Sequence, residues 1–158
     1  MSISGRGGGR LARRKGEHMA YWLLKTEPET WSWAQQVKKG AKGEAWSGVR
    51  NYQARLHLRA MKKGERAFFY HSGDEKAVVG IVEVIKAAYP DHTAADGDWS
   101  MVDVIAVEPF AKAVTLAAIR ADEKLSQMVL VKNSRLSVQP VSDAEWKLVC
   151  KMGGLKVK

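Results

Sequence analysis

The chain has 158 residues, of which 46% are hydrophobic, and a formal net charge of +9. This length suits one domain with a core of its own, and the sequence holds no apolar run long enough to cross a bilayer, so we expect no membrane partner. A single cysteine, Cys150, excludes an intramolecular disulfide and a cysteine-based zinc site, and it favours a reducing compartment inside the cell.

Residues 1–18, "MSISGRGGGRLARRKGEH", differ from the rest of the chain because they are rich in glycine and arginine. We expect them to be a disordered basic tail or an upstream extension before a start at Met19, since they have little to bury. They lack the apolar segment of a secretory signal. Their net charge is +4, so residues 19–158, which we expect to form a single domain, carry a net charge of +5. A charge of this size is compatible with nucleic-acid binding and equally with a plain lysine-rich surface.

Three elements are predicted between residues 21 and 64. Tyr21–Lys25, "YWLLK", is a short apolar run that ends at "TEPE" and predicts a strand. Thr30 can cap a short helix over "WSWAQQVKK", which Gly40 closes. A second helix follows and ends at Gly64, with apolar residues at helical spacing on one face: Ala54, Leu58 and Met61. Its opposite face carries Asn51, Arg55, Arg59 and Lys62.

The middle of the chain has the texture of β-structure. The segments 66–71, 77–85 and 100–108 are rich in β-branched and aromatic residues. In 77–85 both alternating faces are apolar, with Val78, Gly80, Val82 and Val84 on one and Val79, Ile81 and Ile85 on the other. A strand buried on both faces fits a small barrel packed by helices on its outside.

The last third predicts short helices around one more strand. A helical pattern runs from Thr115 to about Met128, and "RLSVQPV" at 135–141 alternates as a strand does. Ser142 and Glu145 form a capping box for a final helix that ends at Gly153. The fold class predicted is therefore α+β, a strongly bent sheet with helices around it.

Catalytic and metal chemistry find little support in the sequence. Cys150 lies on the apolar face of the last helix, as a structural thiol does. Neither G-x-S-x-G nor a phosphate-binding loop is present, and the histidines show no paired spacing. His71 with Lys25 or Glu27 is the one candidate acid–base cluster. We expect no enzyme activity, no metal and no cofactor.

Aromatic residues give a stronger signal, because six tryptophans are many for a domain of this size and several stand where the chain turns. Each alone is typical of a core. Combined with Arg50, Asn51, Tyr70 and His71, they indicate a pocket whose rings stack on a nucleobase while polar groups contact its edge. The basic stripe Arg55, Arg59 and Lys62 would contact phosphates, or be a plain solvated helix face.

Four segments, "YWLLKTEPETWSW", "WSGVRNYQAR", "FFYHS" and "SRLSVQPV", resemble the signature of the EVE domain over about residues 20–154. The resemblance implies a PUA-like pseudo-barrel of bent, mostly antiparallel strands with peripheral helices. EVE domains are similar to YTH domains, which hold a methylated adenine in an aromatic cage. The resemblance therefore implies a reader of modified bases, with modified cytosine in DNA as the leading ligand.

The matching positions imply the site. Lys25 and Thr26 end the first strand beside the pocket, Trp46 is the cage tryptophan, and Gly48 lets the backbone approach the ligand. Tyr52 and Gln53 would tie their helix to the barrel, and Leu56 departs from the family's frequent asparagine. With Trp99, which lies outside the matching segments, the base-pocket candidates are Trp22, Lys25, Thr26, Trp46, Val49, Arg50, Asn51, Tyr70, His71, Ser72, Trp99, Arg135, Ser137 and Val138.

Two alternatives remain at this point. One is a PUA-like module that binds RNA, since nothing in the sequence selects DNA over RNA. The other is an enzyme that processes nucleic acid. In each case we expect a monomer, in the cytoplasm of a bacterium or the nucleus of a eukaryote.

Overall fold

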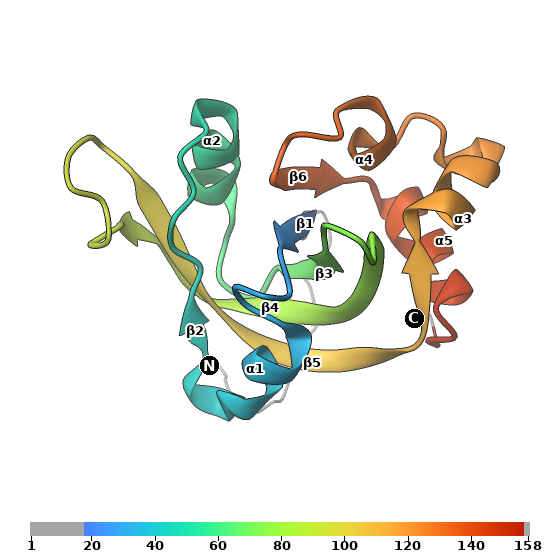
Figure 1. The fold of residues 1–158 in the computed structure, drawn as a ribbon, viewed down its shortest axis with the longest axis horizontal. Helices are drawn as coiled ribbons and strands as arrows, with labels where there is room; N and C mark the ends of the chain where they lie inside the picture. The colour runs from blue at the N-terminus through green and yellow to red at the C-terminus, as the bar shows by residue number, and fades with distance from the viewer. Residues whose placement is uncertain (1–17, 157–158) are drawn as a thin grey trace.

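The computed structural model describes residues 18–156, and its centre is one six-stranded mixed sheet of order β2-β5-β4-β3-β1-β6. Neighbouring strands pair antiparallel except β1 and β3, which run parallel. The sheet bends strongly without closing, which confirms the predicted α+β class and the pseudo-barrel (Figure 1). The strands are β1 (Tyr21–Thr26), β2 (Glu44–Ala45), β3 (Arg66–His71), β4 (Ala77–Pro90), β5 (Ser100–Thr115) and β6 (Val138–Val141).

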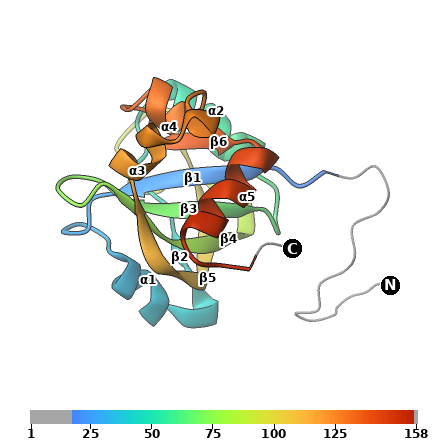
Figure 2. The same ribbon diagram turned by 90° about the vertical axis from the view of Figure 1, so that its right-hand side faces the viewer.

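Most of the helices lie around the sheet in two groups, and α1 lies apart from them against β5 (Figure 1). Figure 1 shows α2 beside the β4–β5 hairpin on one side and α3, α4 and α5 on the other, and Figure 2 shows α5 lying across the strands. The α-helices are α1 (Trp33–Lys38), α2 (Tyr52–Ala60), α3 (Leu116–Ala121), α4 (Val129–Lys132) and α5 (Asp143–Met152). The short 3-10 helices are η1 (Gly40–Lys42) and η2 (Glu123–Leu125). None of the helices described is long and apolar enough to cross a membrane.

Three predictions about helices were wrong in detail. The helix α2 ends at Ala60 and not at Gly64, because the backbone of Met61 is already extended. Ser32, not Thr30, caps α1: its backbone is extended, and its side chain and that of Gln35 form a reciprocal capping box. The helical pattern from Thr115 to Met128 breaks into α3, η2 and α4, because Asp122 is extended and its side chain caps η2. The capping box of Ser142 and the end of α5 at Gly153 were predicted correctly.

The prediction that 77–85 forms a strand buried on both faces was correct, but its assignment of residues to the two faces was wrong. Val78 and Ile81 pack into one core cluster, whereas Val82 and Val84 pack into the other. Register shifts between Val78 and Gly80 and between Ile81 and Val82 interrupt the alternation, so the period of two does not hold across them.

The core consists of two clusters, one on each face of β1 and β3. Successive side chains of a strand point to opposite faces, so Leu24 and Phe69 join the cluster that contains Trp46 and α2. Leu23 and Phe68 join the cluster that packs against α5. The basic tail predicted for residues 1–18 lies, apart from His18, outside the described residues.

Candidate nucleic-acid-binding site

The parallel pair β1–β3 brings two predicted segments together at its carboxyl end. Lys25 lies opposite Tyr70 and Thr26 opposite His71, and the Ser72 N–H donates to the Thr26 carbonyl at 2.9 Å. Strand alternation then separates their side chains. Lys25, Tyr70 and Ser72 point to the face that carries α3, whereas Thr26 and His71 point to the face that carries Trp46 and α1.

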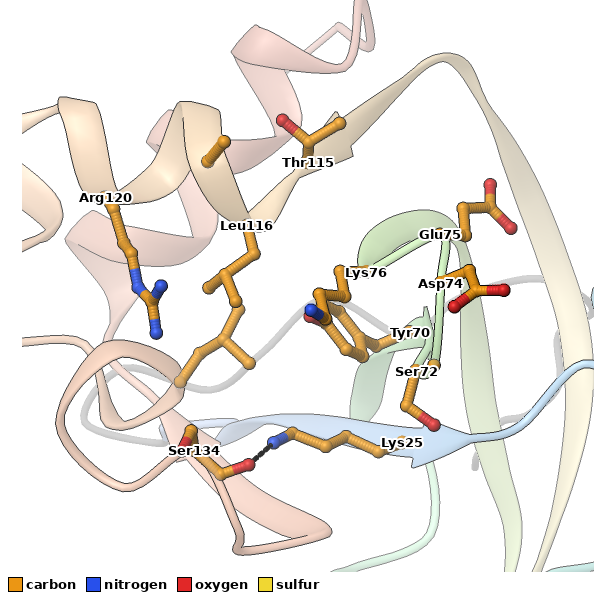
Figure 3. A pocket seen from close by; sticks show the side chains of 13 residues that line it. Lys25, Tyr70, Ser72, Asp74, Glu75, Lys76, Thr115, Leu116, Arg120 and Ser134 are labelled. Carbon is orange, nitrogen blue, oxygen red and sulfur yellow. Dashed lines mark hydrogen bonds between the residues drawn. The ribbon is translucent and has the colours of Figure 1, made fainter.

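A cavity of about 740 Å³ opens on the α3 face of these strand ends (Figure 3). Figure 3 shows Arg120 and Leu116 on one side, Asp74 and Glu75 on the other, and Lys25 with Tyr70 between them. Its polar lining residues are Lys25, Tyr70, Ser72, Asp74, Glu75, Lys76, Thr115, Arg120 and Ser134. Its apolar wall is Leu116, Ala117 and Leu130. Cations, carboxylates, hydroxyls and an apolar wall therefore meet in a volume suited to one nucleotide.

Lys25 is the central cation of the cavity. Its ammonium group donates to the carbonyl of Ser134 and lies 5.7 Å from the centroid of the Tyr70 ring. Burial lowers the pKa of Lys25 from its ordinary 10.5 and raises the pKa of Tyr70, an increase that Arg120 opposes. A partly dehydrated ammonium with donors left to offer is well placed to bind an acceptor atom.

His71 has both ring nitrogens engaged. Its Nε2 accepts the backbone N–H of Trp33 at 3.0 Å, so Nδ1 carries the proton that it shares with Glu75 at 2.7 Å. Thr26 beside it donates through Oγ1 to the carbonyl of Trp31 at 2.9 Å. These contacts hold the turn before α1 against β3. The structure does not bring His71, Lys25 and Glu27 together, because the first two point to opposite faces and Glu27 is exposed.

Two of the three tryptophans expected in the pocket, Trp22 and Trp46, lie in the core. Trp46 is only 7% exposed and packs edge-on against Phe69 at 5.5 Å. Trp22 is buried, and its indole N–H donates to Glu65 at 2.9 Å. Val49 and Val138 are buried in the same cluster. In this conformation these four side chains lie on the opposite face of β1 and β3 from the cavity.

Arg50 and Gly48 are fixed to the β4–β5 hairpin by Asp91. The Asp91 carboxylate is fully buried and accepts from Gly48 N–H at 2.8 Å, from Arg50 Nη1 at 3.0 Å and from Thr93. Burial alone would raise the pKa of Asp91, but the hydrogen bonds from Thr93, Gly48 and Arg50 hold it well below its usual range. Gly48 has a φ of +85°, which favours glycine, and open space where a Cβ would stand.

The predicted basic stripe of α2 contacts this hairpin as well. Asn51 caps the helix through its side-chain oxygen. Arg55 donates to the Asp98 carbonyl at 2.6 Å, and Arg59 bonds Ser100 Oγ at 2.8 Å and pairs with Asp98 at 2.9 Å. Lys62 is exposed. Two of the three predicted phosphate contacts are thus partly engaged within the protein.

The remaining candidates flank the cavity from the segment before β6. Ser137 accepts the backbone N–H of Lys25 at 2.9 Å through its carbonyl, and Arg135 is exposed beside Ser134. Sequence reasoning missed Arg120, Lys76 and Asp74. They come from α3 and the β3–β4 loop and form no local motif, so only proximity to the matched segments at 70–72 and 134–138 could have pointed to them.

A family model described as EVE domain matches residues 20–152. Thymocyte nuclear protein 1 of Gallus gallus is 37% identical in an alignment that covers 82% of this chain and 66% of that protein, just under two thirds of its length. A solved structure from Rhodopseudomonas palustris is 58% identical with a TM-score of 0.83, covering 89% of this chain and 97% of that one.

Human THYN1 protein, solved in complex with DNA containing 5-methylcytosine, has a TM-score of 0.81 and 35% identity, covering 87% of this chain and 99% of that one. A YTH domain from Zygosaccharomyces rouxii shares the fold at 17% identity and a TM-score of 0.53. The matched family model spans most of the chain, from β1 to the end of α5. The chain belongs to the EVE domain family.

Proposed function

We propose that this protein is a non-catalytic nucleic-acid-binding module that reads a modified base, with modified cytosine in DNA as the first candidate. The observation that carries the proposal is the likeness to human THYN1, which was solved with DNA containing 5-methylcytosine. That likeness, at 35% identity, covers 87% of this chain and 99% of the human one.

We place the base in the cavity at the ends of β1 and β3. Cytosine presents an exocyclic amine that needs an acceptor, and a carboxylate is a suitable one. Asp74 supplies it, since Glu75 is already bonded to His71. Lys25 and Arg120 offer donors to the carbonyl oxygen and the unprotonated ring nitrogen of the base.

A methyl group on carbon 5 of the base would face the apolar wall of Leu116 and Leu130. Burial of one methyl-sized group stabilises a complex by about 0.8 kcal/mol. Discrimination between methylated and unmodified cytosine should accordingly be modest, a few-fold. A hydroxymethyl group would need a polar neighbour, and the hydroxyl groups of Ser72 and Thr115 line the same cavity.

We assign the phosphate contacts to the cationic side chains around the opening of the cavity. Lys76 and Arg120 line the cavity, and Arg135 is exposed on the neighbouring segment before β6. Flipping a base costs a few kcal/mol, so backbone contacts have to supply much of the affinity. Binding should be weakened by salt, because each neutralised phosphate releases counterions.

Fluorescence-labelled oligonucleotides test the proposal. Matched single strands and duplexes, with one cytosine, 5-methylcytosine or 5-hydroxymethylcytosine, are titrated with the protein alongside the corresponding RNA. We expect the modified DNA to bind best. Equal, salt-sensitive binding to every DNA would contradict the reading of a modified base. Tighter binding to RNA than to DNA would identify RNA as the ligand.

Variants on the two faces of β1–β3 locate the base. Asp74→Asn and Arg120→Ala alter the cavity, and both residues are exposed, so the fold should tolerate the changes. We expect each to remove the preference for the modified strand. Trp46→Phe serves as the control on the opposite face. Loss of preference in Trp46→Phe alone would move the base to the side of Trp46, Thr26 and Val49.

The absence of catalysis is tested with the same strands. Incubation of end-labelled DNA and RNA with excess protein should return them unchanged on a denaturing gel. Reproducible cleavage that disappears in Lys25→Ala would establish an enzyme instead of a reader.

A further inference from the structure

An exposed pair of aromatic rings stands where α2 meets the β4–β5 hairpin, away from the cavity. Tyr52 and Trp99 are stacked, with centroids 5.1 Å apart and planes inclined by 20°. Tyr52 is 67% exposed, and Trp99 is half-buried beneath it. Tyr52 therefore contacts the hairpin and leaves most of its surface to solvent, whereas the sequence predicted that it ties α2 to the barrel.

Two arginines hold these rings in place. The guanidinium carbon of Arg55 lies 5.0 Å from the centroid of Tyr52 and 5.4 Å from that of Trp99, and that of Arg50 lies 5.7 Å from Trp99. Each arginine is itself fixed, Arg55 to the Asp98 carbonyl and Arg50 to the buried Asp91. The rings are thus positioned before any ligand arrives, which lowers the entropy cost of binding.

The exposed apolar surface continues along α2. Leu56 follows Tyr52 by one helical turn and is 59% exposed, so the two side chains share a face of the helix. Isolated exposed hydrophobic residues are ordinary on proteins. Here two of the four large exposed hydrophobic side chains of the described region adjoin each other and the arginines, which indicates a contact surface.

We propose that this surface, the α2–hairpin platform formed by Tyr52, Leu56, Trp99, Arg50 and Arg55, stacks an unpaired base of the strand that flanks the read nucleotide. Aromatic faces bind bases of any sequence, and arginine contacts both rings and phosphates. The inference rests on the proposed binding of nucleic acid and does not depend on where the modified base is held.

The charges around the platform favour an anionic strand. Asp91 and Asp98 pair with Arg50 and Arg59, whereas Arg55 donates to a backbone carbonyl and keeps its positive charge beside the rings. The hairpin also carries the exposed Asp96. Lys62, two residues beyond the end of α2, adds an exposed cation. Platform and cavity lie on opposite sides of β1 and β3, with α2 and the hairpin on one side and α3 on the other (Figure 1). A strand that crosses the strand ends could reach both.

Tyr52→Ala tests the platform, with Tyr52→Phe as the matched control that keeps the ring. Val37→Ala, at a 49% exposed residue of α1, is the control for an exposed apolar side chain elsewhere. The probes are labelled single-stranded DNA of eight nucleotides, with and without a central 5-methylcytosine. We expect Tyr52→Ala to weaken binding of both probes at least about fivefold, since one stacked base contributes about 1–3 kcal/mol.

The ratio of the two affinities should stay unchanged in Tyr52→Ala, and Tyr52→Phe and Val37→Ala should bind as the unaltered protein does. Unaltered binding by Tyr52→Ala, while Asp74→Asn loses its preference, would overturn the platform and leave the proposed function standing. If Tyr52→Ala lost the preference for the 5-methylcytosine probe, the platform proposal would be overturned as well, because the rings would then belong to the base pocket. No DNA binding by the unaltered protein would overturn both proposals.

Discussion

Lys25 and Tyr70 face each other across the parallel strands β1 and β3, with the ammonium nitrogen 5.7 Å from the centroid of the phenol ring. This contact depends on the register of the two strands, because a shift of one residue would send Lys25 to the opposite face. This pair defines the floor of the cavity to which we assign base reading.

The lowered pKa of Lys25 predicts a pH dependence of binding. Only the protonated ammonium is a cation, so affinity for DNA should fall as the pH rises through a pKa below the ordinary 10.5. Loss of one charge-assisted hydrogen bond should reduce affinity roughly tenfold or more. Titrations between pH 7 and 10 measure this, and Lys25→Arg, which stays charged, should give a flat profile. Parallel profiles for the two proteins would exclude Lys25 from the binding site.

Trp46→Ala should destabilise the protein strongly. The indole is 7% exposed and packs on Phe69, so removing it leaves a cavity that costs about 3–5 kcal/mol. Urea unfolding measures the free energy, and Trp46→Phe, which keeps an apolar ring, should lose less. A cost below about 1 kcal/mol for Trp46→Ala would show that the indole leaves the core in solution.

Asp91→Asn should weaken the attachment of the hairpin to the segment before α2. The buried carboxylate accepts from Arg50, Gly48 and Thr93, and losing its charge should cost about 3 kcal/mol near neutral pH. Its folded pKa lies below the unfolded value of 3.8. Its stabilisation is therefore fully present above about pH 5 and is lost as the pH falls through the folded pKa.

Urea unfolding at several values of pH between 2.5 and 6 tests the role of Asp91. The unaltered protein should lose stability toward the acid end, and Asp91→Asn should lose less over the same interval. Identical slopes would mean that another carboxylate governs the acid limb.

Gly80→Ala should displace the Trp33 indole. A Cβ at residue 80 would clash with the Trp33 ring, and β4 is held by its neighbours on both sides. Overpacking of this kind costs typically about 1–3 kcal/mol. Thermal or urea unfolding measures it, and in a Trp33→Leu background the same substitution should cost much less. Additive effects of the two changes would contradict direct contact.

The sequence by itself was sufficient for the local elements. Caps, turns and periodicity act within a few residues, so β1, β3, the capping box of Ser142 and the apolar face of α5 could all be predicted. The segments that carry the family resemblance also fixed the fold class correctly. The predictions were wrong in detail where two nearby residues could each cap a helix, as Ser32 and Thr30 could for α1. They were also wrong where a bulge interrupted the alternation of side chains in β4.

Only the tertiary structure decided which candidate residues meet. The sequence grouped fourteen residues as one pocket. The structure distributes them among the core around Trp46, the cavity with Lys25 and Tyr70, and the platform with Arg50 and Trp99. It also added Arg120 and Asp74, which lie far apart in the chain. The reason is physical: a strand places neighbouring residues on opposite faces, and the pairing of distant strands, which no short window encodes, determines what each face meets.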